Sequence, residues 1–458
     1  MDDYQRFAAL EYKAMPDLRG LRPGAAWDRQ DQEITKAEKA GNRVTVLAAA
    51  WRTLAEAKAA GLEMTERLRL VEAEGRPVLR ITWRAGIKHD QPMLVLDADA
   101  DAAILAAIGL EVHGDHDLSM RPNAHVRQLL DRRMTTSRLL QSPDLRESWR
   151  RIIVREVFED RLTGGGGVLV GASRKVVRAM FKDADHSFSE MSEDQISQVM
   201  LGTHLHGARW LWFGGGSLGS NRYETCTRVI VIGREELPID ILEDQGRALF
   251  GDVPGNPLTF AAQDSTGRTL LPQREVPYLM ADGSAKAVNV PCHPDPRIHL
   301  LQQQSRELAT RQLIERLRLA RAKSPKHVLI GCNIPIPGMP VDRLVSWEEL
   351  CPDRLTAALI DGLTYKGGVR LTPAGLHEGS PRVFSSLEAA RVFLKRRTLN
   401  RSEAAKSFAD RFSSRDILSM RIRNSQPMAR TETALMLRSL ADPIQSVAHR
   451  LWGPCQFV

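Results

Sequence analysis

The chain has 458 residues, of which 43% are hydrophobic and 26% charged, a balance typical of globular proteins, and the length suggests roughly three domains. It has no run of ~18 apolar residues, and its five cysteines are scattered without C-x-x-C spacing. These features exclude a membrane span, a disulfide framework and a zinc module, and favour a cytoplasmic protein. Lys and Arg exceed Asp and Glu by 64 − 56 = 8, which favours polyanionic partners, although ordinary solubility charge explains the same surplus.

The first predicted elements are helices, which extend to about residue 88 and include the Ala-rich stretch Val44–Ala60. A short apolar run, Met93–Leu96, then closes on Asp97 and predicts a buried strand. The alanine-rich stretch Ala102–Ile108 predicts the helix that follows this strand.

Strands and helices alternate in the middle of the chain. Residues 125–140 indicate a basic connector, and residues 252–298 an irregular insertion or hairpin. Short apolar runs predict strands at Val168–Gly171, at Arg228–Gly233 and from His327, and helices are expected over 173–181, 239–250 and 299–322. This alternation predicts an α/β fold with a parallel sheet flanked by helices.

The C-terminal tail differs in charge from the rest of the chain. Residues 365–458 contain 16 Lys and Arg against 7 Asp and Glu, a net charge of 16 − 7 = +9. This exceeds the charge of the whole chain, so the remainder is close to neutral. Residues 386–397 and 400–412 predict two short helices joined by a turn, as in helix-turn-helix modules.

The first candidate site is the acidic segment after the predicted strand Met93–Leu96. Asp97, Asp99 and Asp101 follow it at alternate positions, where open α/β sheets bind ligands and where carboxylates can hold Mg²⁺. One of these Asp residues could bind the Mg²⁺ that accompanies a nucleotide, or could act as an aspartyl nucleophile. The segment could also connect a nucleotide site with a nucleic-acid site. An ordinary helix N-terminus stabilised by Asp explains them equally simply.

Two further candidate sites follow later in the chain. The glycine-rich segment 214–221 offers backbone amides to a phosphate, or is a plain loop. On the predicted helix 299–322, Gln312 and Arg316 share a face, and a guanidinium there could act as an arginine finger or belong to a solvated basic surface. No residue set has the spacing of a familiar metal site.

Four segments, taken in order, resemble the second half of a superfamily 2 DNA helicase of the plasmid, phage or integrative-element type. They are LDADAD, VLVGASRKVV, GSLGSNRYETCTRVIVIG and RQLIERLRLAR. The resemblance covers about Asp90–Ala358 and implies a RecA-like lobe. It implies three groups of site residues: nucleotide-binding Asp97, Asp99, Gly219 and Asn221; nucleic-acid-binding Ser173, Lys175 and Ser220; and catalytic Gln312, Arg316 and Arg318.

The sequence also departs from this family. Asp99 stands where the family has Thr, Leu218 where it has Arg, and Glu315 where it has Gly, while Leu319 occupies the place of the second arginine of the last motif. No G-x-x-x-x-G-K-[ST] loop occurs in the chain. Because this loop and its Lys hold the β- and γ-phosphates, we expect ATP and Mg²⁺ to bind only with a separate P-loop-bearing helicase subunit.

The expected organisation is the end of a first lobe, mostly helical, over residues 1–120, a helicase-like lobe over 121–360 and a basic tail over 361–458. The expected function is to bind DNA or another nucleic acid and to supply the arginine side of an ATPase site. One alternative is a non-enzymatic DNA-binding accessory protein of a mobile element. Another is a Mg²⁺-dependent phosphatase that uses Asp97.

Overall fold

The computed structural model describes residues 49–73, 75–82, 91–95, 99–114, 121–214, 221–397, 399–412, 416–425, 429–438 and 443–458. The chain forms two compact units that interleave along the sequence. The first contains residues 1–118, 236–275 and 289–308, and the second contains residues 119–235, 276–288 and 309–458. In the described part of the chain, no helix has the length and apolar character that crossing a bilayer requires.

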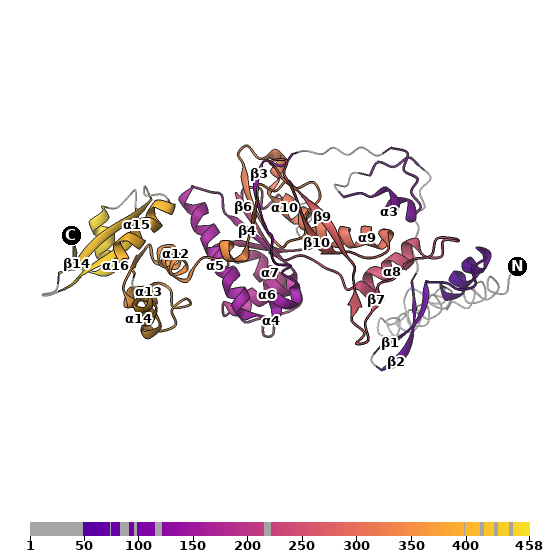
Figure 1. Cartoon of the computed structure of the whole chain (residues 1–458), viewed down its shortest axis with the longest axis horizontal. Helices are drawn as coiled ribbons and strands as arrows, with labels where there is room; N and C mark the ends of the chain where they lie inside the picture. The colour runs from indigo at the N-terminus through magenta and orange to yellow at the C-terminus, as the bar shows by residue number, and fades with distance from the viewer. Residues whose placement is uncertain are drawn as a thin grey trace, which may run out of the picture. The chain divides into compact units, whose positions relative to one another are not determined.

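The second unit is built on a six-stranded sheet in which every neighbouring pair is parallel (Figure 1). From one edge to the other, its strands are β12 (Arg343–Val345), β3 (Ala124–Leu129), β11 (Lys326–Gly331), β6 (Arg228–Ile232), β4 (Val168–Ala172) and β5 (Arg209–Trp212). The α/β fold with a parallel sheet flanked by helices is therefore present. Because all strands are parallel, their first residues share one edge of the sheet and their last residues share the other.

The sequence predicted the strands that are buried along their whole length and missed one that carries a charged residue. β4 and β6 are buried along their whole length and read as continuous Val and Ile runs, as central parallel strands do. β3 was expected to be a basic connector, and this prediction was wrong. Its charged residue Arg127 sits within the strand because the guanidinium donates to the buried carboxylate of Glu156, at 2.8 Å.

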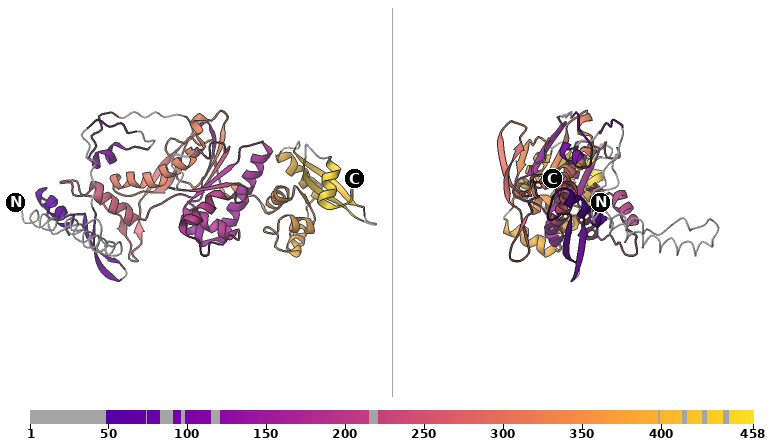
Figure 2. Two further views of the ribbon diagram at one scale, coloured as in Figure 1. Left: turned by 180° about the vertical axis from the view of Figure 1, so that it is seen from behind. Right: turned by 90° about the vertical axis from the view of Figure 1, so that its right-hand side faces the viewer.

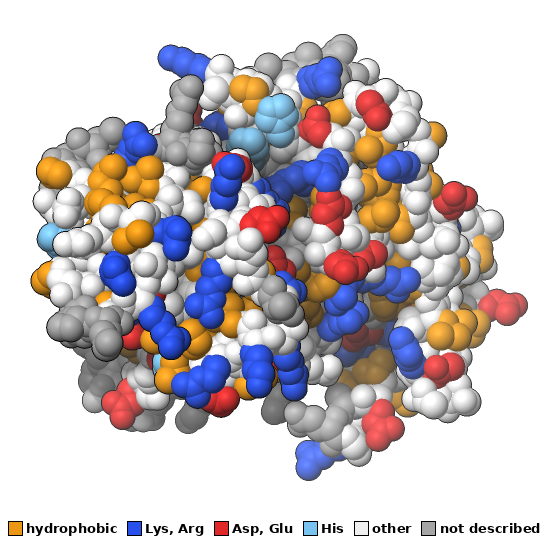
Figure 3. Space-filling view, turned by 60° about the vertical axis from the view of Figure 1, so that its left-hand side comes forward, with side chains coloured by type: hydrophobic (Ala, Val, Ile, Leu, Met, Phe, Trp, Pro, Cys, Tyr) orange, Lys and Arg blue, Asp and Glu red, His pale blue; other side chains and the backbone are white. Residues whose placement is uncertain are grey.

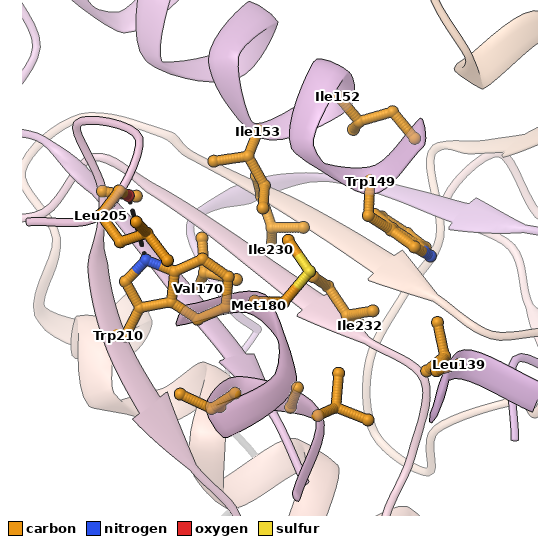
Figure 4. Packing of buried hydrophobic residues seen from close by; sticks show 14 of the residues in the cluster. Leu139, Trp149, Ile152, Ile153, Val170, Met180, Leu205, Trp210, Ile230 and Ile232 are labelled. Carbon is orange, nitrogen blue, oxygen red and sulfur yellow. Dashed lines mark hydrogen bonds between the residues drawn. The ribbon is translucent and has the colours of Figure 1, made fainter. Parts of the chain in front are cut away.

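Helices α4 (Thr136–Gln141), α5 (Pro143–Leu162), α6 (Arg174–Asp183) and α7 (Glu193–Gly202) contribute to one large core cluster with the sheet. Figure 4 shows Ile153 of α5 and Met180 of α6 packed against Val170 and Ile230 of the strands. The indole Nε1 of Trp210 donates to the carbonyl of Leu205 at 3.0 Å, so this buried polar group keeps a partner.

On the opposite face of the strands, helix α10 (Ala309–Ile314) lies over the sheet. A Cβ at Gly171 of β4 would come within 2.4 Å of the methyl carbons of Leu313. The helix and the strand therefore approach each other at a distance that only glycine permits. Figure 2 shows the same sheet and helices from behind.

The single helix expected over 299–322 is not formed, and the prediction was wrong in this respect. The run consists of α9 (Pro296–Gln303), a π turn (η2, Gln304–Leu308), α10, and two 3₁₀ turns (η3, Glu315–Leu317, and η4, Leu319–Arg321). Arg318 separates the last two with a left-handed φ of 55°. An L-residue in this conformation cannot continue a right-handed helix, so the helix ends before Arg318.

The first unit contains a β-hairpin, β1 (Leu68–Ala73) with β2 (Arg76–Ile81), and helices α3 (Ala102–Ala107), α8 (Ile239–Phe250) and α9. The predictions of α3 and α8 are confirmed. The helical prediction for the N-terminal region holds for residues 49–59 but not for the hairpin. The strand predicted at Met93–Leu96 is not found in its described part: residues 93–95 have no strand partner, and Leu94 is 82% exposed.

Two hairpins and one helical turn lie between α8 and the C-terminal helices. They are the hairpins β7 (Ala262–Gln263) with β8 (Thr269–Leu270) and β9 (Gln273–Leu279) with β10 (Ala285–Pro291), and the helical turn α11 (Trp347–Leu350) after β12. The insertion or hairpin expected over 252–298 is thus largely hairpin.

The C-terminal part of the second unit packs four antiparallel strands with five helices. The sheet order is β13 (Gly368–Arg370), β15 (Thr431–Leu437), β14 (Ile417–Asn424) and β16 (Cys455–Phe457). The helices are α12 (Arg354–Lys366), α13 (Pro373–Gly379), α14 (Leu387–Arg396), α15 (Arg401–Phe412) and α16 (Ile444–Trp452). The two helices predicted over 386–397 and 400–412 are confirmed as α14 and α15.

Helix α5 joins this C-terminal part to the parallel sheet. Its Val154 and Phe158 belong to the same buried cluster as α12, α14 and α15. Arg150 of α5 also donates to both carboxylate oxygens of Asp361 in α12, each at 3.1 Å, with both side chains buried. One face of α5 therefore packs on the parallel sheet, and another packs on the C-terminal helices.

Replacing Gly331 with Ala is expected to lower the free energy of unfolding by ~1–3 kcal/mol, the usual cost of overpacking a core. A Cβ at Gly331 would lie 2.5 Å from the indole of Trp149 and 2.5 Å from the carbonyl oxygen of Val231. Gly202→Ala is the control, because a Cβ there meets nothing within 4 Å and alanine favours helix. Urea unfolding of both variants measures the difference, and equal stabilities would contradict the packing at Gly331.

Candidate functional site

The structure brings together two residues that the sequence separates by 97 positions. Arg318 donates from Nε and Nη2 to Oδ1 of Asn221, at 3.1 and 2.7 Å. The left-handed backbone at Arg318 ends the helical run and turns the chain at this point. Asn221, the last residue of the glycine-rich segment 214–221, lies between β5 and β6.

Arg316 lies beside Arg318 and makes this a doubly basic site. Partial burial and the positive charge of Arg318 lower the pKa of Arg316 from its ordinary value, and only Tyr223 opposes this shift. Among the described residues, neither Arg316 nor Arg318 has a carboxylate ion-pair partner. Two neighbouring cations without a counter-charge favour an anion, because an anion there relieves their repulsion without breaking an existing ion pair. We call Arg316, Arg318 and Asn221 the arginine site.

The arginine site lies at the edge of the sheet where the strands begin. Lys326, the first residue of β11, donates from Nζ to the carbonyl of Leu317 at 2.7 Å and to that of Glu224 at 2.5 Å. Asn123, which precedes β3, donates from Nδ2 to the carbonyl of Ala322 at 2.8 Å. The turns on both sides of Arg318 are thus fixed to the starts of two strands.

Ser173 and Lys175, predicted to bind nucleic acid, lie at the other edge. Ser173 follows β4 and is the N-cap of α6, but its side chain makes no capping bond and instead accepts from the hydroxyl of Thr136 at 3.2 Å. Lys175 is exposed in the first turn of α6. Burial raises the pKa of the Glu235 carboxyl, and the positive charge of the nearby Lys175 opposes this increase. The two predicted groups therefore occupy opposite edges of one sheet.

The remaining predicted residues are Asp97, Asp99, Gly219, Ser220 and Gln312. Asp97, Gly219 and Ser220 lie outside the described residues. Asp99 belongs to the first unit, is 7% exposed, and its backbone carbonyl accepts from Nε2 of Gln304 at 2.7 Å. Gln312 is exposed on α10.

Asp101 behaves as the simpler interpretation of the acidic segment expects. Its carboxylate accepts from the backbone N–H groups of Ala103 and Ile104, at 2.9 and 3.0 Å, and caps α3. In the described ranges, no three His, Cys, Asp or Glu side chains are grouped so that they could hold a metal ion.

Tyr223 is a neighbour of the arginine site that the sequence interpretation missed. It is almost fully buried, its hydroxyl has no hydrogen-bond partner among the described residues, and it lies close enough to Arg316 to affect the pKa of that group. Burial raises the pKa of the phenol, so Tyr223 is a neutral donor there at neutral pH. Its position two residues after Asn221 was the only signal in the sequence.

His206, which lies between α7 and β5, allows the structure of this region to be tested by the pH dependence of stability. Burial, together with the positive charges of Arg150 and Arg382, lowers the pKa of His206 to about 3, whereas the unfolded side chain titrates near 6.5. Between these values the unfolded chain binds a proton that the folded chain does not. The free energy of unfolding should therefore fall as the pH drops from about 6.5 towards 4.

His206→Asn should make this fall shallower, since Asn has no proton to take up and tolerates the left-handed φ of 55° at this position. Urea unfolding at several pH values measures the slope. His204→Asn, at the exposed neighbour, should leave the slope as in the wild type. Parallel curves for His206→Asn and wild type would contradict the burial of an uncharged imidazole.

Comparison of the chain with protein-family models, with curated proteins and with solved structures finds no match. The geometry of the described residues therefore carries the functional argument.

Proposed function

We propose that this chain is the second, RecA-like lobe of a nucleic-acid-dependent ATPase of the helicase type, and that it completes an ATPase site whose P-loop is on a separate subunit. The observation that carries the proposal is the arginine site: two arginines beside Asn221 that have no carboxylate partner in the described part of the chain. The order of motifs in the sequence supports the same function.

The arginine site fits the chemistry of phosphoryl transfer. A guanidinium directed at the γ-phosphate stabilises the negative charge of the transition state. Among the described residues, Arg316 has no ion pair to break before it does so. Asn221 holds the neighbouring Arg318 by accepting two of its N–H groups on one oxygen. ATP would bring its phosphates and Mg²⁺ from the P-loop subunit, and this chain would supply the opposing cations.

Ser173 and Lys175 are proposed to contact the nucleic-acid backbone at the other edge of the sheet. The exposed ammonium of Lys175 and the N-terminus of the ten-residue helix α6 both favour a phosphate group. Nucleotide and nucleic acid would then bind at opposite ends of the same strands, and the sheet would connect them.

The test uses the purified full chain with and without any P-loop-bearing protein that is encoded beside its gene. The chain alone should hydrolyse no ATP, and the mixture should hydrolyse ATP at a rate that single-stranded DNA increases. Tight stoichiometric ATP binding by the chain alone would contradict the proposal. So would the absence of a P-loop protein in the gene's neighbourhood that restores the activity.

A second candidate is a non-enzymatic DNA-binding accessory protein, which the C-terminal helices favour. α14 and α15 are two short helices in succession, and residues 387–412 contain 7 Lys and Arg against 3 Asp and Glu. Figure 3 shows Lys and Arg side chains spread over one face of the molecule, with carboxylates between them. In this case, nucleic acid would bind and no partner would restore ATP hydrolysis.

A further inference from the structure

A small, strongly charged pocket opens in the second unit, separate from the arginine site in its residues. Its volume is about 180 Å³, and its charged lining consists of Arg127, Arg155, Arg343, Arg411, Glu159 and Glu349. These six side chains come from β3, β12, α5, α11 and α15. Four arginines from separate elements converge on one cavity, and two carboxylates oppose them.

Part of this charge is already paired. Glu156, buried behind the pocket, accepts from Arg127 at 2.8 Å and from Arg155 at 2.9 Å. Burial would raise the pKa of Glu156, but the charges of Arg127, Arg155 and Arg228 outweigh it and lower this pKa to about 2. At the mouth of the pocket, Arg343 pairs with Glu349, and both side chains are exposed.

Two donors remain for a ligand besides Arg343, whose ion pair with Glu349 is exposed to solvent. Arg155 is only 5% exposed, and its Nε has no hydrogen-bond partner among the described residues; Oε1 of Glu159 is 3.8 Å from this Nε. Arg411 is exposed on α15, where its guanidinium lies over the ring of Phe412 and has no ion-pair partner in the described part of the chain. A buried donor without an acceptor is costly, and an anion in the pocket would satisfy it.

The size of the pocket limits the ligand. At ~30 Å³ per water molecule, its volume corresponds to about six waters. It is below the ~300–1,000 Å³ of sites that enclose a whole small-molecule ligand. The pocket therefore accommodates one anionic group rather than a complete nucleotide.

We infer that this pocket binds a single phosphoryl group, held between Arg155 at its base and Arg343 and Arg411 at its mouth. Several acceptor oxygens directed to different sides suit donors that come from α5, β12 and α15, and charge-assisted bonds to arginine are the strong ones. Glu159 opposes the anion; burial and the negative charge of Glu156 raise the pKa of this carboxyl, which weakens the opposition. The phosphoryl group has two possible sources, free phosphate or the backbone of a nucleic acid.

The experiment uses the full chain and two probes, inorganic phosphate and a short single-stranded oligonucleotide, each titrated at constant ionic strength. Binding is followed by the shift in Tm with phosphate and by fluorescence anisotropy with the oligonucleotide. Arg411→Gln should weaken binding of the phosphoryl group about tenfold, as expected for one lost charge-assisted hydrogen bond. Glu159→Gln should strengthen it, because the lining loses a negative charge.

Arg391→Gln is the matched control: this arginine is exposed on the neighbouring helix α14 and pairs with Glu388 at 2.5 Å, outside the pocket. A loss with both probes assigns the pocket to a strand phosphate, and a loss with phosphate alone assigns it to the free ion. If Arg411→Gln binds both probes as Arg391→Gln does, or if Glu159→Gln weakens binding, the inference is overturned. Neither result depends on ATP hydrolysis, so failure here is distinct from failure of the proposed function.

Discussion

Replacing Arg316 with Ala is expected to reduce nucleic-acid-stimulated ATP hydrolysis by the chain and the proposed P-loop subunit by about 10³–10⁵-fold, the range observed for arginine fingers. The reason is that Arg316 has no carboxylate partner among the described residues, so its charge is available to the transition state. The measurement is kcat at saturating ATP, with nucleotide affinity determined in parallel. The affinity should change much less than kcat, because the guanidinium acts mainly in the transition state.

Arg321→Ala is the control for this experiment, since Arg321 lies in the same run, is exposed, and ends the last 3₁₀ turn. It should retain near wild-type activity. Arg316→Lys should rescue little, because an ammonium lacks the planar fork of a guanidinium. A kcat for Arg316→Ala within a few-fold of the wild-type value would contradict the assigned role.

Exchanging the exposed basic residues of α14 and α15 for Gln is expected to weaken nucleic-acid binding by about 10²–10³-fold at 0.1 M salt. The quadruple variant changes Lys395, Arg396, Arg401 and Lys406, which are exposed and have no ion-pair partner in the described part of the chain. If each contacts one phosphate, the slope of log K against log salt should become shallower by about 3. Titrations at several salt concentrations measure both quantities.

The control for this variant exchanges Arg382 and Arg391, whose charges are already paired with Asp185 and Glu388. It should leave the salt slope close to that of the wild type. An unchanged slope in the quadruple variant would show that these helices do not bind the backbone. ATP hydrolysis restored by the P-loop subunit in that case would favour the helicase-like function over the accessory-protein function.

The sequence predicted the strands best where burial alone determines the residue types. β4, β6 and β11 are central strands covered on both faces, so their apolar runs were recognisable. β3 was missed because its arginine is neutralised by Glu156, a partner from a helix that follows it in the chain. The strand predicted at Met93–Leu96 failed for the opposite reason: an apolar run predicts burial, but burial needs a neighbour, and Leu94 is exposed.

The arginine site was also predicted only in part, because its geometry depends on tertiary contacts. The residue types and their order indicated Arg316, Arg318 and Asn221, but helical spacing placed both arginines on one continuous helix. The left-handed backbone at Arg318 is set by the tertiary fold, in which Lys326 holds the carbonyl of Leu317. Such a break cannot be derived from helix propensity, because arginine is a good helix former.

The double role of α5 has a consequence for how this gene can change. A chain that ended near residue 358 would leave Val154 and Phe158 facing water and Arg150 without the carboxylate of Asp361. The apolar surface exposed in this way and the lost ion pair would together cost a large fraction of the stability of an ordinary domain. Truncations and gene fusions that separate α5 from α12, α14 and α15 should therefore be selected against.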